Sequence, residues 1–245
     1  MKPPSGEIET DSDQILERYA ALRAEIDSLC GACGRAPSSV KLMLVTKTVP
    51  IGRIRPVIAA GHRLFGENKV QELAEKRADL ADPSLDFHFI GHLQTNKVKK
   101  CLENTSLVHS VDRLPLALEM NKQLQKTDRT MKILIQVNTS GEESKFGVRP
   151  SELLPLIRVQ GLMTLARFSA DQEIVRPCFR ILRQLAEDVR AEKIENVEMN
   201  ELSMGMSSDY RIAIEEGATI VRVGTAVFGQ RPLPDSHYWP ENPRD

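Results

Sequence analysis

Short apolar segments alternate with longer amphipathic segments along most of the chain. A short apolar run bounded by turn residues is typical of a buried strand, whereas apolar residues three or four positions apart predict a helix. On this basis we expect an opening helix over 13–29, followed by eight strands. The strands are expected at 40–48, 62–68, 86–91, 106–112, 132–140, 159–166, 200–207 and 218–229.

A helical pattern separates the predicted strands from one another. After the first strand, Ile51, Ile54, Val57 and Ile58 share one face of a helix, and Gly61 marks its end. Further helices are expected over 69–80, up to 102, over 116–124, from Ser151, over 173–192, and from Ser208 or Asp209 to Glu216.

Regular alternation of strands and helices specifies a parallel sheet, and eight such units suit a closed barrel. An open doubly wound sheet is the competing architecture, but the Gly-rich dinucleotide turn after its first strand is missing. We therefore predict a single (β/α)8 TIM-type barrel over 13–231. A polar N-terminal tail over 1–12 and a Pro-rich C-terminal tail over 232–245 are expected to flank it.

Charge and composition limit the classes of partner. The 33 basic and 34 acidic residues give a net charge of −1, which offers no broad electrostatic footprint for nucleic acid or an anionic membrane. No apolar run reaches the ~18 residues that span a bilayer, and the polar N-terminus does not read as a secretory signal. We therefore expect neither a nucleic-acid nor a membrane partner. As separate expectations, the protein is cytoplasmic and a monomer.

Cysteine and histidine usage does not indicate a metal site or a disulfide framework. Cys30 and Cys33 form one CxxC, but no second pair or close histidine completes a zinc site. His88 and His92 likewise lack a neighbouring carboxylate or cysteine cluster. We expect no bound metal and a reducing compartment.

The candidate chemistry lies where the predicted strands end, because barrels of this kind build their sites at the carboxyl ends of strands. Lys47 ends the first strand, although a lysine loses much by being desolvated. The other polar or adaptable positions at these ends are Glu67, Asn68, Gly91, His92, Asn138, Met163, Thr164, Ser207, Ser208, Arg222, Gly224 and Thr225.

The ends of strands seven and eight suit a phosphate. Ser207 and Ser208 precede a short helix, whose free N–H groups and dipole favour an anion, and Gly224 and Thr225 add a close backbone approach and a hydroxyl. The alternative is that the two serines only cap the helix.

With Lys47 across the mouth, the residues suit a ligand with a phosphate and an aldehyde, which describes pyridoxal 5′-phosphate (PLP). The alternative for Lys47 is a lysine that extends out of the rim.

Several motifs then resemble a known family. "VTKTVP", "FGENKVQE", "FHFIGHLQTNK", "QVNTSGEESKFG", "GLMT", "LSMGMSSDYRIAI" and "GATIVRVGTAVFG" occur in order between 40 and 231. They are similar to the pyridoxal phosphate homeostasis proteins, which are single-barrel relatives of the alanine racemase N-terminal domain.

This resemblance implies a role for each matched residue. Lys47 would form the Schiff base with PLP, and Arg222 would face the pyridine nitrogen. Ser207, Gly224 and Thr225 would hold the phosphate, with Ser208 as a helper, while Asn68, Met163 and Met204 would line the pocket. Lys145 is a second lysine that could receive the cofactor transiently, and the alternative for it is a solvated loop lysine.

The expected function follows from Arg222 and from what the chain lacks. An arginine keeps its proton, so the pyridine ring stays a weak electron sink, which argues against transaminase or decarboxylase chemistry. Racemisation needs a second base, and the nearest tyrosine, Tyr210, is expected to be a packing residue. We therefore expect a protein that acts in PLP homeostasis without catalytic turnover and could pass PLP to apoenzymes. The alternatives are a single-domain PLP-dependent amino-acid racemase and a barrel enzyme that acts on a sugar phosphate through Lys47.

Overall fold

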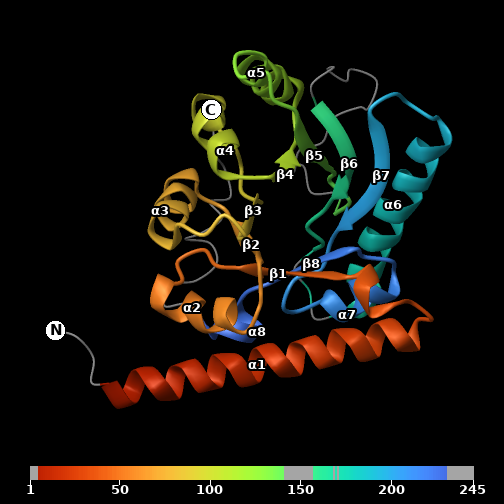
Figure 1. The fold of residues 1–245 in the computed structure, drawn as a ribbon. Coiled ribbons are helices and arrows are strands. Elements are labelled where there is room, and N and C mark those ends of the chain that lie inside the picture. The colour runs from red at the N-terminus through yellow and green to blue at the C-terminus, as the bar shows by residue number, and fades with distance from the viewer. Residues whose placement is uncertain (1–4, 141–156, 168, 170, 231–245) are drawn as a thin grey trace.

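Eight parallel strands close into a barrel in the order β1 to β8 (Figure 1). The computed structural model describes residues 5–140, 157–167, 169 and 171–230. The strands are β1 (Lys41–Val45), β2 (Leu64–Glu67), β3 (Asp86–Phe89), β4 (Leu107–Val111), β5 (Met131–Gln136), β6 (Ile157–Met163), β7 (Val197–Ser203) and β8 (Ile220–Val223). The predicted barrel is confirmed.

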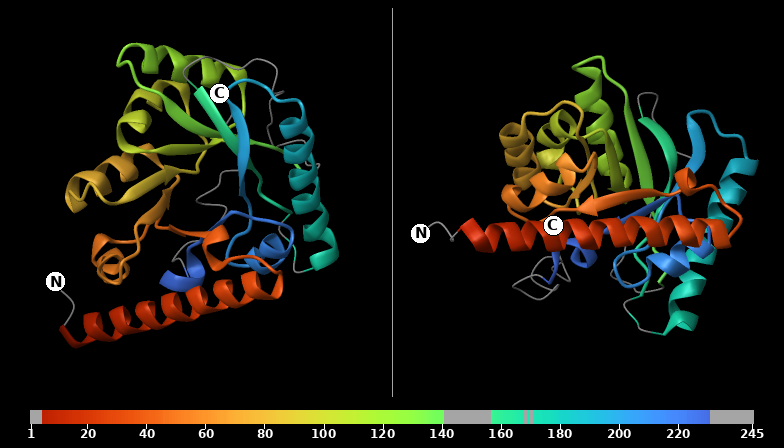
Figure 2. Two further views of the ribbon diagram at one scale, coloured as in Figure 1. Left: turned by 45° about the vertical axis from the view of Figure 1, so that its right-hand side comes forward. Right: turned by 60° about the horizontal axis from the view of Figure 1, so that its bottom comes forward.

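Helices surround the barrel on its outer face (Figure 2). They are α1 (Ser5–Ala32), α2 (Ile51–Ala59), α3 (Val70–Leu80), α4 (Val98–Asn104), α5 (Leu114–Gln125), α6 (Gln172–Ala191), α7 (Tyr210–Glu215) and α8 (Thr225–Phe228), with 3-10 turns η1 (Pro37–Ser39) and η2 (Thr95–Lys97). The predicted helix from Ser151 and the loop with Lys145 lie outside the described residues.

The long helix α1 packs along α2, α7 and α8 on the outside of the barrel (Figures 1 and 2). It begins at Ser5, within the segment predicted to be a tail, and Asp11 of that segment pairs with Arg53 of α2 at 2.7 Å. The early turns contain almost no apolar residues, so hydrophobic periodicity could not detect them. The folded body therefore includes residues assigned to the N-terminal tail.

The last strand is shorter than predicted. The apolar run over 218–229 was expected to be one strand, but β8 ends at Val223 and Thr225–Phe228 form α8. Val227 and Phe228 are buried in this helical turn. A short apolar run does not distinguish a strand from a buried helical turn, which explains the error.

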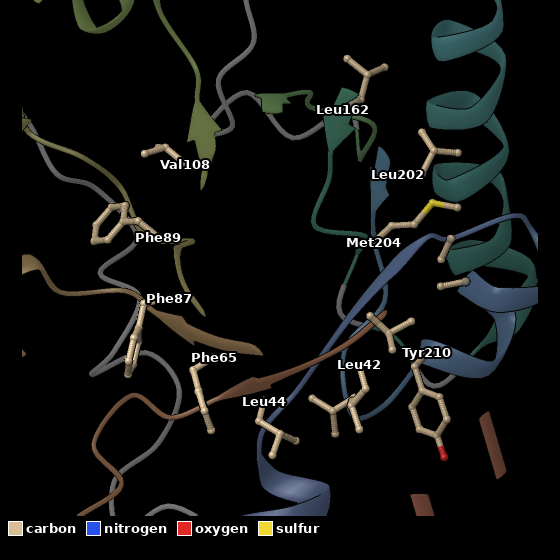
Figure 3. Close-up of a cluster of buried hydrophobic side chains, with 14 of the residues drawn as sticks. Leu42, Leu44, Phe65, Phe87, Phe89, Val108, Leu162, Leu202, Met204 and Tyr210 are labelled. Carbon is tan, nitrogen blue, oxygen red and sulfur yellow. The ribbon is translucent and has the colours of Figure 1, made fainter. Parts of the chain in front are cut away.

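The hydrophobic core has two layers separated by the strands. Alternate strand residues point into the barrel, where they form a cluster of Met43, Val45, Ile90, Leu107, Leu134, Met163 and Ile220. The others point outward against the helices, as Figure 3 shows for Leu42, Leu44, Phe65 and Phe87 among others. This period of two decides which strand-end residues can reach the interior of the barrel mouth.

Two negative observations hold for the described part of the chain. None of its helices is both long and apolar enough to cross a membrane. Within the same residues, no group of three or more His, Cys, Asp and Glu side chains could hold a metal ion. His88 and His92 each lie 3.3 Å from one carboxylate, that of Asp86 and that of Asp112 respectively.

Candidate functional site

Lys47 is buried at the carboxyl end of β1, with 2% of its surface exposed. Met43 and Val45 belong to the interior cluster, so the same alternation directs position 47 inward. Thr46 points the other way, and its hydroxyl donates to Glu67 Oε1 at 2.6 Å. The sequence thus places a buried amine at the mouth of the barrel.

The turn that carries Lys47 has a strained residue. Thr48 has a φ of 62°, in the left-handed region that β-branched residues rarely adopt. Its backbone N–H donates to Glu72 Oε1 of α3 at 2.6 Å. The surrounding contacts therefore have to hold this conformation, since it costs about 1–3 kcal/mol.

Lys76 of α3 is buried behind this turn. Its ammonium group donates to Thr46 O at 2.5 Å and to Glu67 Oε1 and Glu72 Oε1 at 2.7 Å each. Burial raises the pKa of Glu67 to about 7, although the Lys76 charge acts in the opposite direction. The three side chains of Lys76, Glu67 and Glu72 together hold the backbone on either side of Lys47.

This support was missed by the sequence analysis, which grouped Glu67 with Asn68 at the mouth. The period of two places them on opposite faces of β2, and Glu67 points outward to α3. Lys76 follows the buried Val70 and Leu73 at helical spacing, which is the signal that could have placed it on the inner face of α3.

Asn68 lies close to the end of β3. A side chain at Gly91 would place its Cβ 2.1 Å from Asn68 O, so only glycine allows this approach. The Ser110 hydroxyl in turn donates to Gly91 O. The ends of β2, β3 and β4 therefore meet at the same rim of the barrel, with Asn68 only 9% exposed.

Ser207 does not cap the helix that follows it in sequence. Its hydroxyl oxygen accepts from the backbone N–H groups of Gly224 and Ala226, both at 3.4 Å, at the beginning of α8. Helix α7 begins later, at Tyr210, without a side-chain cap bond. The region where β7 and β8 end thus brings together the Ser207 hydroxyl, two backbone N–H groups and the partly buried Thr225. Ser208, by contrast, is exposed.

Arg222 is buried inside the barrel on β8, the strand that pairs with β1. Its guanidinium group donates to Ser203 Oγ and to Thr164 O, both at 2.8 Å. Burial lowers the pKa of Arg222 to about 10, with Asp209 acting in the opposite direction. The side chain remains a cation and a hydrogen-bond donor at neutral pH.

The two methionines lie on different sides of the barrel wall. Met163 belongs to the interior cluster, whereas Met204 packs in the outer layer beside Leu202 (Figure 3). Ser203 lies between the outward-pointing Leu202 and Met204 and faces Arg222. The structure therefore does not bring Met204 to the interior with the other predicted residues, and we leave it out of the proposed site.

Tyr210 also points away from the barrel interior (Figure 3). Its hydroxyl donates to Glu25 Oε2 of α1 at 2.8 Å. Burial and the Glu25 contact raise the pKa of Tyr210 to about 12. Tyr210 thus links α7 to α1 by a hydrogen bond, which agrees with the expected packing role.

Three chemically different groups thus occupy neighbouring strand ends. Lys47 provides an amine that can add to an aldehyde, and Arg222 provides a cationic donor that suits a ring nitrogen. The hydroxyl and N–H groups around Ser207 suit an oxyanion. These residues fit a ligand that carries an aldehyde, a ring nitrogen and a phosphate, as PLP does.

The chain is similar to proteins of known family. The family model for the alanine racemase N-terminal domain matches residues 18–232. The pyridoxal phosphate homeostasis protein of Aquifex aeolicus (strain VF5) is 44% identical over 224 residues, which cover 88% of this chain and 97% of the relative.

Solved structures agree with this similarity. PipY of Synechococcus elongatus PCC7942, solved with PLP bound, is 36% identical with a TM-score of 0.77, and the match covers 88% of this chain and 100% of that chain. Alanine racemase of Clostridium difficile 630 shares the fold alone, with 15% identity and a TM-score of 0.68 over 91% of this chain and 58% of that chain.

Proposed function

Because the chain belongs to the pyridoxal phosphate homeostasis protein family, we propose that it holds PLP as a Schiff base on Lys47 and acts in intracellular PLP homeostasis without catalytic turnover. The observation that carries the proposal is a buried lysine at the end of β1, on the strand beside the buried Arg222. The PLP-bound PipY structure, at 36% identity, supports the same ligand.

Each group of the ligand has a proposed partner. Lys47 binds the aldehyde carbon, and Arg222 donates to the pyridine nitrogen. Ser207, Gly224 and Thr225 bind the phosphate, and the exposed Ser208 assists from the edge. Asn68 and Met163 line the pocket.

The absence of turnover is proposed from two contacts. Arg222 keeps its proton at neutral pH, so it holds the ring nitrogen without protonating it, and the bound ring is a weak electron sink. Racemisation would also need a base opposite Lys47, and the Tyr210 hydroxyl is bonded to Glu25 on the outside of the barrel. The chain is then a monomeric binding protein that could pass PLP to apoenzymes.

Visible absorption of the purified protein mixed with PLP tests the proposal. Wild type is expected to show a band of the lysine adduct, and Lys47→Ala is expected to lack it. Lys41→Ala is the matched control, because Lys41 lies at the opposite end of the same strand and pairs with Glu201. A band of equal intensity in Lys47→Ala, or racemisation of alanine by wild type at an enzymatic rate, would contradict the proposal.

A further inference from the structure

A continuous chain of hydrogen bonds crosses the interior of the barrel below the proposed site. Arg222 donates to Ser203 Oγ at 2.8 Å, and Ser203 Oγ lies 2.9 Å from His109 Nδ1. His109 Nε2 lies 2.9 Å from His88 Nδ1, and His88 Nε2 lies 3.3 Å from Asp86 Oδ2. We call these five residues, from β8, β7, β4 and β3, the interior chain.

The interior chain is unusual for this architecture. The interior of such barrels is usually filled by Val, Ile and Leu. His109 and Ser203 are 0% exposed and His88 is 7% exposed, so their polar atoms have no water to bond to in place of one another. Buried polar groups of this kind are costly unless every one is satisfied, and here each finds a partner.

One assignment of the hydrogens gives each polar atom of the interior chain a partner of the opposite kind. A guanidinium group only donates, so the Ser203 oxygen accepts from it, and in this assignment the hydroxyl hydrogen goes to His109 Nδ1. His109 then carries its hydrogen on Nε2 and donates to His88 Nδ1. His88 carries its own on Nε2 and donates to the Asp86 carboxylate. All the hydrogens therefore point away from Arg222.

The charges agree with this direction. Burial lowers the pKa of His109 well below its usual value, and the positive charges of Arg222 and Lys41 act in the same direction. Burial alone would raise the pKa of Asp86, but its contacts with His88 and Ser106 lower it overall. The interior chain thus joins a cation at one end to a carboxylate at the other through a neutral His109.

We infer that Ser203, His109, His88 and Asp86 are positioning residues that hold Arg222 as a fixed donor to the pyridine nitrogen of PLP. His109 takes the Ser203 hydrogen, which leaves a lone pair of the Ser203 oxygen facing Arg222 and fixes the plane of the guanidinium group. Because no hydrogen of the interior chain points toward the site, the chain cannot deliver a proton to the ring nitrogen. This inference rests on the proposed function, since it deepens the role given there to Arg222.

The first measurement uses the protein without PLP. Nitrogen-15 NMR of histidine-labelled protein is expected to show His109 neutral at pH 7 with its hydrogen on Nε2. A hydrogen on Nδ1, or a charged ring, would overturn the inference whether or not the protein binds PLP.

The second measurement compares PLP affinity among variants. Ser203→Ala and His109→Phe are expected to weaken PLP binding ~10-fold, the size expected for one hydrogen bond to a charged group, while leaving inorganic phosphate binding unchanged. His109→Asn keeps an acceptor toward Ser203 and is expected to restore most of the affinity. His62→Phe is the matched control, because His62 is a buried histidine that contacts Tyr19 outside the barrel interior.

The outcomes separate the two proposals. If wild type binds PLP and Ser203→Ala binds it equally well, the positioning role is wrong and the proposed function stands. Equal weakening of PLP and inorganic phosphate would also overturn the positioning role, because it would mark a general loss of the site. If wild type binds no PLP, the proposed function fails, and the NMR result still reports on the interior chain. Ser203→Ala removes a single oxygen, so it serves if His109→Phe does not fold.

Discussion

Replacing Glu67 by glutamine is expected to change how stability depends on pH. Burial raises the pKa of Glu67 from 4.5 to about 7 in the folded protein. The folded state therefore binds this proton more tightly than the unfolded state does. The resulting stabilisation is fully present below pH 4.5 and is lost as the pH rises through 7. The difference between the two pKa values corresponds to about 3 kcal/mol, and the Glu67 side chain is fully buried, so solvent does not screen it.

Urea unfolding at half-unit steps from pH 4.5 to 8 measures this effect. Over that range, wild type is expected to lose about 3 kcal/mol that Glu67→Gln retains, because glutamine does not titrate. Glu75→Gln is the matched control, since it removes an exposed carboxylate from α3, the helix that carries Lys76. Parallel curves for wild type and Glu67→Gln would refute the reasoning. The opposite slope would show that Lys76, and not burial, dominates the pKa of Glu67.

Three other substitutions test individual contacts. Ser207→Ala removes the hydroxyl that accepts from the Gly224 and Ala226 N–H groups, and calorimetry is expected to show PLP affinity reduced by ~10-fold. Unchanged affinity would show that Ser207 does not bind the phosphate. Tyr210→Phe breaks the hydrogen bond to Glu25 and is expected to lower the free energy of unfolding in urea by about 1 kcal/mol without affecting PLP absorption. Loss of the absorption band would place Tyr210 in the site. Gly91→Ala would place a Cβ 2.1 Å from Asn68 O and is expected to destabilise the protein by about 1–3 kcal/mol in thermal unfolding. A melting temperature equal to that of wild type would show that the backbone at the barrel rim moves to accommodate the added methyl group.

The barrel could be predicted from the sequence because its signal is local and repeated. Each strand is a short apolar run, and each is followed by a segment with helical spacing or by a turn. The end of β8 could not be predicted in the same way, since Thr225–Phe228 is apolar and equally compatible with a strand or a helical turn. The start of α1 escaped detection for the converse reason, because its first turns are almost entirely polar.

The sequence could predict the residues of the candidate site that lie at strand ends, but not the contacts that support them. Lys47, Ser207 and Arg222 follow from the rule that barrel sites form at the carboxyl ends of strands. The supporting contacts depend on which face of each element turns inward, and that requires the three-dimensional register. Lys76 reaches Thr46 from α3, and His109 reaches Ser203 across the barrel from a strand 94 residues away in the chain. No local pattern encodes either contact.

The most direct test of the proposed role of Lys47 is borohydride reduction of the wild-type protein with PLP, followed by peptide mapping. Reduction is expected to fix one pyridoxyl group on the peptide that contains Lys47. A label found on another lysine, such as Lys145, with Lys47 unmodified would contradict the assignment of Lys47 as the residue that holds the cofactor.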